Sequence, residues 1–219
     1  MKKWAIMTII TIIGLAAGLL LLWIVAGYLP VRYIETPKYE VVSSGKDYEV
    51  RAYAPQIVAE VTKQGEYRQT QNDGFRDVAG YIFGSNKTKA SISMTAPVLH
   101  QPDNQSEKIA MTAPVLHEPG TAPATYKLAF VMPSSYTLDT LPMPNNPNVT
   151  LRQVPARKCA ALVFRGYAEE ATVLQKTRQL LESLKADGMV TTGVPFLAQY
   201  HPPWTMPLMR RNEILVEVK

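Results

Sequence analysis

The sequence predicts an α+β domain, a twisted antiparallel or mixed sheet or distorted β-barrel flanked by two helices, behind one N-terminal transmembrane helix. Three observations lead to this fold class. The N-terminus begins with a long uncharged apolar stretch. Many short segments then alternate apolar and polar residues, which is the period of a half-buried strand. Finally, two segments of helical period each follow two such strands, so the order of elements indicates a pseudo-twofold internal repeat.

The N-terminal stretch is long enough to cross a membrane. Residues 5–29, 25 in a row, carry no charge, and a spanning helix needs about 20 apolar residues. Trp4, Trp23 and Tyr28 lie near its ends, where amphipathic rings favour the membrane interface. The alternative is a cleaved signal peptide, but its apolar region usually has about 7–15 residues. We therefore expect an uncleaved anchor over residues 1–29.

The charges beside the anchor predict its orientation. Lys2, Lys3 and the free amine precede it, whereas Arg32 and Lys38 follow it. This modest excess favours the N-terminus inside. The soluble domain, residues 30–219, is then extracytoplasmic, and periplasmic if the source is bacterial.

The first half of the soluble domain is predicted to contain strands, a helix and further strands. Three strands come first, at Tyr39–Val42, Tyr48–Tyr53 and Gln56–Thr62. Apolar residues at helical spacing then predict a helix that ends at Gly84, with a buried face made by Phe75, Val78, Ala79 and Ile82. A further strand is expected at Tyr126–Met132, followed by a Pro-rich loop over residues 133–147.

A heptapeptide occurs twice between that helix and that strand. Met94–His100 and Met111–His117 are identical, and a polar stretch separates them. The pattern indicates two short strands joined by a loop. Because proline lacks the ladder donor, Pro97 and Pro114 are expected at strand ends, edges or bulges.

The second half repeats this order. Residues 149–155 resemble residues 49–55, one hundred positions earlier. A strand at Arg157–Arg165 and a helix over about Ala168–Ala186 follow, with Asp187-Gly188 as its end. Two last strands are predicted near Pro195–Tyr200 and Asn212–Val218.

Composition argues against several function classes. The formal charge is +5 without a long basic run, so nucleic acid is not expected as a partner. Cys159 is the sole cysteine and has small apolar neighbours, which favours a core position. If the twin strands form a hairpin, His100 and His117 lie about 23 Å apart and do not share a metal. We find no catalytic constellation and expect no metal site.

Five motifs in order resemble the SOUL family of haem-binding proteins. They begin with Tyr48-Glu49-Val50-Arg51, and continue with Gly80-Tyr81-Ile82-Phe83-Gly84 and the twin Met-Thr-Ala-Pro-Val copies. Tyr200-His201-Pro202-Pro203 and Arg210-Arg211-Asn212-Glu213 complete the series. The resemblance spans most of residues 38–219 and implies the same α+β architecture.

The resemblance also implies a haem pocket over the first helix of the soluble domain and the late Pro-rich loop. The positions it indicates, together with nearby apolar and cationic side chains, are Asn72, Phe75, Val78, Ala79, His201, Trp204, Met206 and Arg210. Some members carry an axial histidine directly after the strand arginine, and that position is Ala52 here. The propionate-binding cations of other members are also missing, although Arg51, Arg210 or Arg211 is a candidate to replace them.

We therefore expect a non-catalytic, membrane-anchored protein that binds haem or a related tetrapyrrole non-covalently in an apolar cleft. One alternative is a scaffold, or a binder of another small amphiphile, whose haem pocket has decayed. The other is a tetrapyrrole-modifying enzyme, for which His201, Asp73 and Asp77 are placed to act as acid or base.

Overall fold

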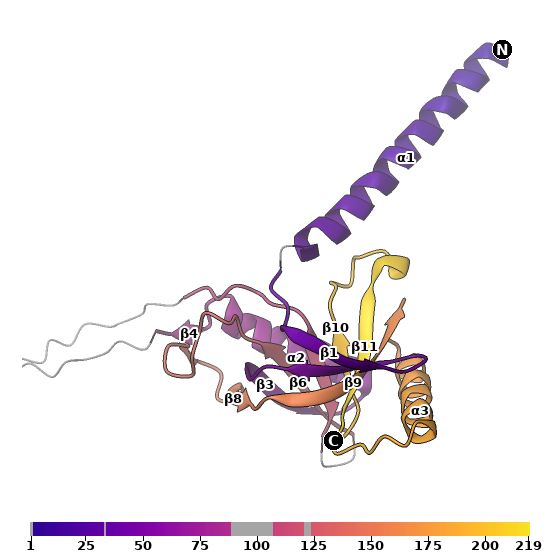
Figure 1. Ribbon diagram of the computed structural model, residues 1–219. Coiled ribbons are helices and arrows are strands. Elements are labelled where there is room, and N and C mark those ends of the chain that lie inside the picture. The colour runs from indigo at the N-terminus through magenta and orange to yellow at the C-terminus, as the bar shows by residue number, and fades with distance from the viewer. Residues whose placement is uncertain (1, 33, 89–106, 121–123) are drawn as a thin grey trace, which may run out of the picture.

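The computed structural model describes residues 2–32, 34–88, 107–120 and 124–219. In this part of the chain, three helices and a curled nine-stranded antiparallel sheet form the protein. One helix projects from the domain, and the other two lie against the sheet (Figure 1). The predicted α+β class, with its two flanking helices and internal repeat, is confirmed.

The elements follow the order that the sequence predicts. The helices are α1 (Lys2–Arg32), α2 (Tyr67–Ile82) and α3 (Glu170–Ala186), with a 3-10 turn η1 (Pro207–Met209). The strands of the first half are β1 (Tyr39–Ser44), β2 (Glu49–Tyr53), β3 (Gln56–Gln64), β5 (Val115–Pro119) and β6 (Thr125–Val131). Those of the second half are β8 (Thr150–Val154), β9 (Arg157–Arg165), β10 (Phe196–Gln199) and β11 (Arg211–Glu217). A separate two-stranded sheet pairs β4 (Asn86–Lys87) with β7 (Met143–Pro144).

The two halves of the domain exchange one strand each. The sheet runs in the order β1-β2-β9-β11-β10-β5-β6-β3-β8. Strand β2 of the first half therefore pairs with β9 of the second, and β8 of the second half pairs with β3 of the first. The halves meet at the β5–β10 pair, where His117 faces Leu197. Each half is thus completed by a strand of the other, so both halves share one sheet.

The register corrects the predicted offset of the repeat by one residue. Arg51 faces Cys159 and Arg152 faces Val58, so both 51/152 and 58/159 are related by 101 positions rather than 100. A shift of one residue turns a strand side chain to the opposite face. The equivalent of Arg152 is therefore Arg51, not Ala52.

Both faces of the sheet are buried, one of them beneath the helices. Helix α2 packs on β3 and β6, with Val78 against Phe130, and α3 packs on β9 and β11, with Leu180 against Ile214. A third apolar cluster, which includes Leu215, contains no helix residue and lies on the opposite face. This division follows from strand alternation, since successive side chains point to opposite sides.

Local signals for element ends are mostly confirmed. Gly84 and Gly188 follow the two domain helices and have positive φ, a conformation that glycine adopts without strain. Pro114 directly precedes β5, where the missing donor is tolerated, and Cys159 is buried as predicted. The first heptapeptide, with Pro97 and His100, lies outside the described residues.

Helix α1 contains an apolar stretch of 22 residues, Ile6–Gly27, with mean hydropathy 2.7. No residue in the most apolar part of this stretch is buried. Its length and composition suffice for a membrane crossing. A membrane anchor and a signal sequence both meet this criterion.

Candidate functional site

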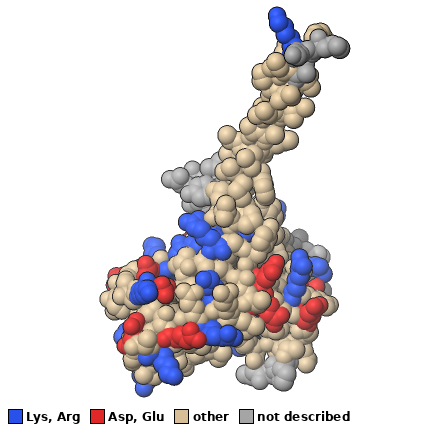
Figure 2. Space-filling view, turned by 90° about the vertical axis from the view of Figure 1, so that its right-hand side faces the viewer, with Lys and Arg blue, Asp and Glu red and all other residues tan. Residues whose placement is uncertain are grey.

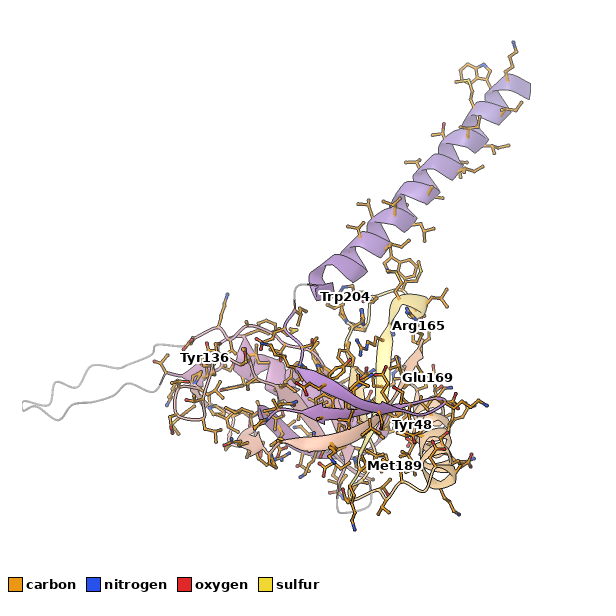
Figure 3. All side chains as sticks on the ribbon, in the orientation of Figure 1. Tyr48, Tyr136, Arg165, Glu169, Met189 and Trp204 are labelled. Atoms are coloured by element: carbon orange, nitrogen blue, oxygen red, sulfur yellow. The ribbon has the colours of Figure 1, made fainter. Side chains whose placement is uncertain are left out.

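The loop between β10 and β11, residues 200–210, meets the end of α1 and is called the late loop below. The Trp23 indole Nε1 donates to the carbonyl oxygen of Trp204 at 2.7 Å, and the Thr205 hydroxyl donates to that of Gly27 at 3.0 Å. Thr205 is fully buried, whereas the Trp204 side chain is exposed beside the helix (Figure 3). The loop is therefore fixed where the helix leaves the domain.

The late loop is held from within by Arg210. Its guanidinium donates to the carbonyl oxygens of Pro203 and Thr205, the latter at 2.7 Å, and stacks over the ring of Tyr167 at 4.5 Å. These carbonyls accept because the Pro-rich loop has few backbone partners of its own. The predicted ligand cation is thus already engaged in positioning the loop.

The predicted residues of α2 divide into a buried and an accessible pair. Val78 and Ala79 are buried in the core, as the helical period requires. Asn72 is exposed. The prediction that Phe75 belongs to the buried face is wrong, because this side chain is 41% exposed, although its ring packs 5.4 Å from that of Phe130. The accessible part of the predicted α2 site is therefore Asn72 and Phe75.

The strand register relates Phe75 to the late loop. In β6, β5 and β10, Phe130, Val115 and Gln199 form one row across the sheet, and His201 lies two residues beyond Gln199, the last residue of β10. With about 4.8 Å between strands, this row spans roughly 10 Å. Phe75 and His201 thus stand near its two ends. In the chain outside the undescribed segments, no hydrogen bond, ion pair or ring contact joins α2 to the late loop.

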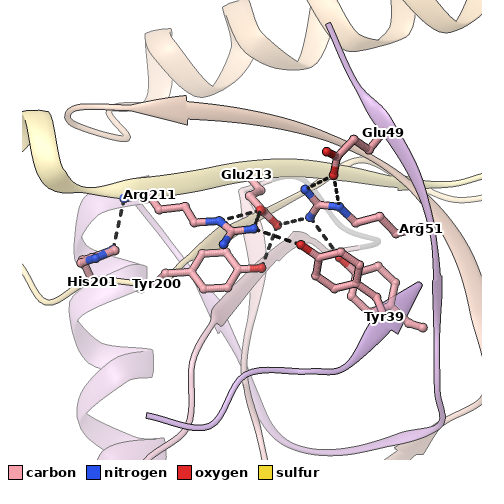
Figure 4. Close-up of polar contacts among 8 residues, drawn as sticks. Tyr39, Glu49, Arg51, Tyr200, His201, Arg211 and Glu213 are labelled. Carbon is pink, nitrogen blue, oxygen red and sulfur yellow. Dashed lines mark hydrogen bonds and ion pairs between the residues drawn. The ribbon is translucent and has the colours of Figure 1, made fainter. Parts of the chain in front are cut away.

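A buried ionic cluster lies at the start of β11 (Figure 4). Glu213 is fully buried and pairs with Arg51 at 2.9 Å and with Arg211 at 2.5 Å, and it also accepts from the Tyr200 hydroxyl at 2.7 Å. Burial raises the pKa of Tyr200, and the Glu213 carboxylate raises it further, so this hydroxyl remains a donor. No local pattern predicts this cluster, because Arg51 and Glu213 are 162 positions apart in the chain.

A separate cavity of about 590 Å³ opens at the other side of the domain. The segment before β1, the β2–β3 turn and the loop after β6 line it, with Lys38, Gln56 and Tyr136 among the polar side chains. In Figure 3 Tyr136 lies well away from Trp204. None of the predicted haem-site residues lines this cavity.

Comparisons with known proteins decide the family. The family model described as SOUL heme-binding protein matches residues 34–104 and 100–217. The chain belongs to the SOUL heme-binding protein family. Heme-binding protein 1 of Sus scrofa is 25% identical over 186 residues, 83% of this chain and 91% of that protein. Heme-binding protein 1 of Xenopus laevis has the same identity over 83% of this chain and 90% of its own length.

Solved structures share the fold of this SOUL domain at low sequence identity. The C-terminal domain of EcmrR has a TM-score of 0.56 and 10% identity, over 83% of this chain and 98% of that domain. A hydrolase from Listeria innocua has a TM-score of 0.50 and 13% identity, over 81% of this chain and 94% of its own. At these identities the likeness concerns the fold alone.

The tautomer of His201 bears on how this SOUL domain would hold haem. Its Nδ1 accepts the backbone N–H of Arg211 at 3.1 Å, so the neutral ring carries its hydrogen on Nε2. Burial lowers the pKa of His201, and nearby Arg211, Arg165 and Arg210 lower it further, which keeps the ring neutral. Neither nitrogen then offers a lone pair to iron in this arrangement.

The other candidate polar groups are also engaged. Arg51 is buried in the Glu213 cluster, and Arg211, which is partly exposed, shares the same carboxylate. Asp73 pairs with Arg76, and Asp77 pairs with Lys63 at 2.5 Å, so the two acids of the enzyme alternative lie in ion pairs. Among the described residues, no three His, Cys, Asp or Glu side chains lie close enough to hold a metal ion.

Two further side chains that the sequence singles out, His117 and Cys159, are buried, and burial shifts the pKa of each. His117 is buried at the centre of the sheet, and this burial lowers its pKa to about 4, so it is neutral near pH 7. Burial raises the pKa of the Cys159 thiol to about 11, so this thiol is protonated at neutral pH. Met94 lies outside the described residues.

Proposed function

We propose that this SOUL protein binds haem or a related tetrapyrrole non-covalently, without catalysis, in an apolar cleft between α2 and the late loop, while α1 anchors it in a membrane. Family membership over residues 34–217 carries this proposal. The relatives named heme-binding proteins match over most of their length, so the resemblance concerns the whole domain.

The exposed side chains support an apolar contact. Phe75 on α2 and Trp204 on the late loop are large apolar groups that remain exposed, and Met206 beside Trp204 is partly exposed. Ligand sites are lined mainly by apolar and aromatic side chains with few polar groups. A planar macrocycle that covers the row between α2 and the late loop would bury these groups.

The polar groups indicate how such a ligand is held. His201 presents no free lone pair, and Arg51 and Arg210 are engaged within the protein. We infer that the macrocycle, rather than the iron, supplies most of the binding free energy. A porphyrin without metal should therefore bind with an affinity similar to that of haemin.

The test is a titration of the full chain in lipid nanodiscs with haemin, followed by the Soret band, and with protoporphyrin IX, followed by its fluorescence. Empty nanodiscs give the background. The proposal predicts saturable binding of both ligands, weakened by Phe75→Ala and unchanged by His201→Ala. Leu174→Ala, at an exposed position of α3, is the matched control. Signals equal to those of empty nanodiscs would refute the proposal.

The membrane anchor is supported by the apolar stretch Ile6–Gly27 and the lysines before it. We propose that the N-terminus is inside and the domain extracytoplasmic. Full-length protein should resist alkaline carbonate extraction from membranes, and protease added outside the cytoplasm should digest the domain but spare the N-terminus. Release of a shortened, soluble chain would instead indicate signal-peptide cleavage.

A second candidate is the binding of another small amphiphile, which the separate cavity favours. Its volume of about 590 Å³ lies within the range of about 300–1,000 Å³ typical of ligand pockets. Native mass spectrometry of detergent-purified protein would reveal a co-purified lipid or small amphiphile. Its loss on Gln56→Trp, which adds bulk at the cavity wall, would favour this function over tetrapyrrole binding.

A further inference from the structure

A group of apolar side chains is exposed at the base of α1. Trp204 and Leu208 of the late loop are 60% and 76% exposed, and Tyr167, after β9, is 56% exposed. Arg210 stacks on Tyr167, and Arg165 donates to the carbonyl oxygen of Leu208 at 3.1 Å, so the end of β9 and Tyr167 just beyond it contact the late loop that carries Trp204, Leu208 and Arg210. We call these five residues the root surface.

The root surface is tied to the end of the apolar stretch of α1. Gly27, the last residue of that stretch, accepts the hydroxyl of Thr205, and Trp23 one turn earlier donates to Trp204. The contact is close, since a Cβ on Gly27 would lie 3.0 Å from the Thr205 Cα. If α1 spans a membrane, this contact places the late loop at the level where the helix leaves the hydrocarbon.

The chemistry of the root surface matches that level of a bilayer. Tryptophan and tyrosine are enriched at membrane interfaces. Arg165 is exposed and donates to Leu208 through one nitrogen, Nη1, so its other guanidinium nitrogens face solvent and can bind a phosphate group. Residues 194–212 contain no Asp or Glu that would repel lipid phosphates. Lys and Arg side chains also gather beside the base of the helix (Figure 2).

We propose that the root surface inserts into the headgroup layer of a phospholipid bilayer and forms a second membrane contact next to the anchor. The inference rests on the proposed membrane insertion of α1. A lipid partner is favoured over a protein because the surface continues directly from the apolar helix and has no carboxylates in the late loop. The bilayer would then cover Leu208 and Tyr167, which the proposed tetrapyrrole site does not use, and restrict the rotation of the domain about the anchor.

The experiment uses the full chain in phosphatidylcholine–phosphatidylglycerol vesicles, with an environment-sensitive NBD label on a single introduced cysteine. Cys159 needs no replacement, because its buried thiol has a raised pKa and should stay unlabelled in the folded chain. Three variants are compared: Leu208→Cys in the root surface, Leu174→Cys on exposed α3, and Leu15→Cys within α1. Lipids that carry a nitroxide at a shallow or a deep position quench the label according to its depth.

The proposal predicts that the label at 208 is blue-shifted and quenched most by the shallow nitroxide, that the label at 15 is quenched by the deep one, and that the label at 174 behaves as in water. Quenching at 15 with a water-like label at 208 would overturn the inference and leave the anchor intact. Absence of quenching at 15 would refute the anchor, and the inference with it. Equal quenching at 208 and 174 would indicate unspecific adsorption and would also overturn it.

Discussion

The two ends of the sheet carry equivalent arginines in contrasting surroundings. Arg51 in β2 and Arg152 in β8 occupy the same position of the internal repeat, and each pairs with a glutamate. The side chain of Arg51 is 1% exposed, whereas that of Arg152 is 43% exposed. The repeat thus preserves the arginine but not its partner, because the position equivalent to Glu60 is Ala161, and it buries the arginine at one end only.

The additional strand β1 accounts for the difference. It pairs with β2, and the ring of Tyr39 on β1 covers the Arg51 guanidinium at 4.4 Å. At the other end, β8 is the last strand of the sheet that the described residues form. Arg152 therefore remains at an open edge, although its guanidinium bonds Glu60 through two nitrogens.

The buried ion pair of Arg51 holds a loop in place, which the exposed ion pair of Arg152 does not. Tyr200 begins the late loop and Arg211 follows its last residue, and both bind Glu213, so the cluster fixes both points from which this loop extends. An exposed pair usually contributes less than about 1 kcal/mol, whereas removal of one partner of a buried pair is strongly destabilising. The asymmetry therefore gives the end beside α1 its rigidity.

The largest expected difference between the two ends of the sheet is the loss of stability when the glutamate at each end is replaced by alanine. Glu213→Ala removes the fully buried carboxylate that Arg51 and Arg211 share and leaves Arg51 only the partly exposed Glu49, so it should lower the free energy of unfolding by about 3–5 kcal/mol. Glu60→Ala at the exposed end should cost about 1 kcal/mol or less. Urea unfolding of the full chain in detergent, followed by circular dichroism, measures both. Equal losses would contradict the contrast between the ends.

A second pair of equivalent positions with different residues lies at the centre of the sheet. There His117 in β5 faces Leu197 in β10, its equivalent in the internal repeat. Between pH 6.5 and about 4 the unfolded chain protonates this histidine and the folded chain does not, because burial lowers its pKa to about 4. Its contribution is thus complete above pH 6.5 and lost as pH falls toward 4, by up to about 3 kcal/mol.

His117→Leu should flatten this part of the pH dependence, measured as thermal stability from pH 7 to pH 4. His201→Ala is the control, because burial lowers the pKa of that partly exposed ring as well. An unchanged slope in His117→Leu together with a flat slope in His201→Ala would assign the dependence to the late loop instead.

The smallest expected effect concerns the ring that covers Arg51. Tyr39→Ala should lower the free energy of unfolding by about 1 kcal/mol, because it removes the cation–π contact. Tyr39→Phe keeps the ring and loses a 3.4 Å contact from Arg211 to the hydroxyl, so it should be nearly neutral. Equal losses in the two variants, measured by urea unfolding, would assign the role to the hydroxyl.

The family, the order of elements and the candidate anchor follow from the sequence alone. Strand β9 begins and ends where alternation predicts, and Leu180 and Leu184 form the buried face of α3. These features depend on local periodicity, which needs no knowledge of neighbours in space. The candidate site was predicted by resemblance. The structure adds that Val78 and Ala79 are buried in the core and that Arg210 forms hydrogen bonds within the late loop.

The pairing of distant residues was decided by the tertiary structure. The sequence could not show that β2 and β8 exchange between the halves, nor that the repeat offset is 101 rather than 100. For the same reason it did not reveal the Arg51–Glu213 pair or the tautomer of His201. Which strands become neighbours, and in which register, depends on contacts between segments far apart in the chain, and local pattern does not encode them.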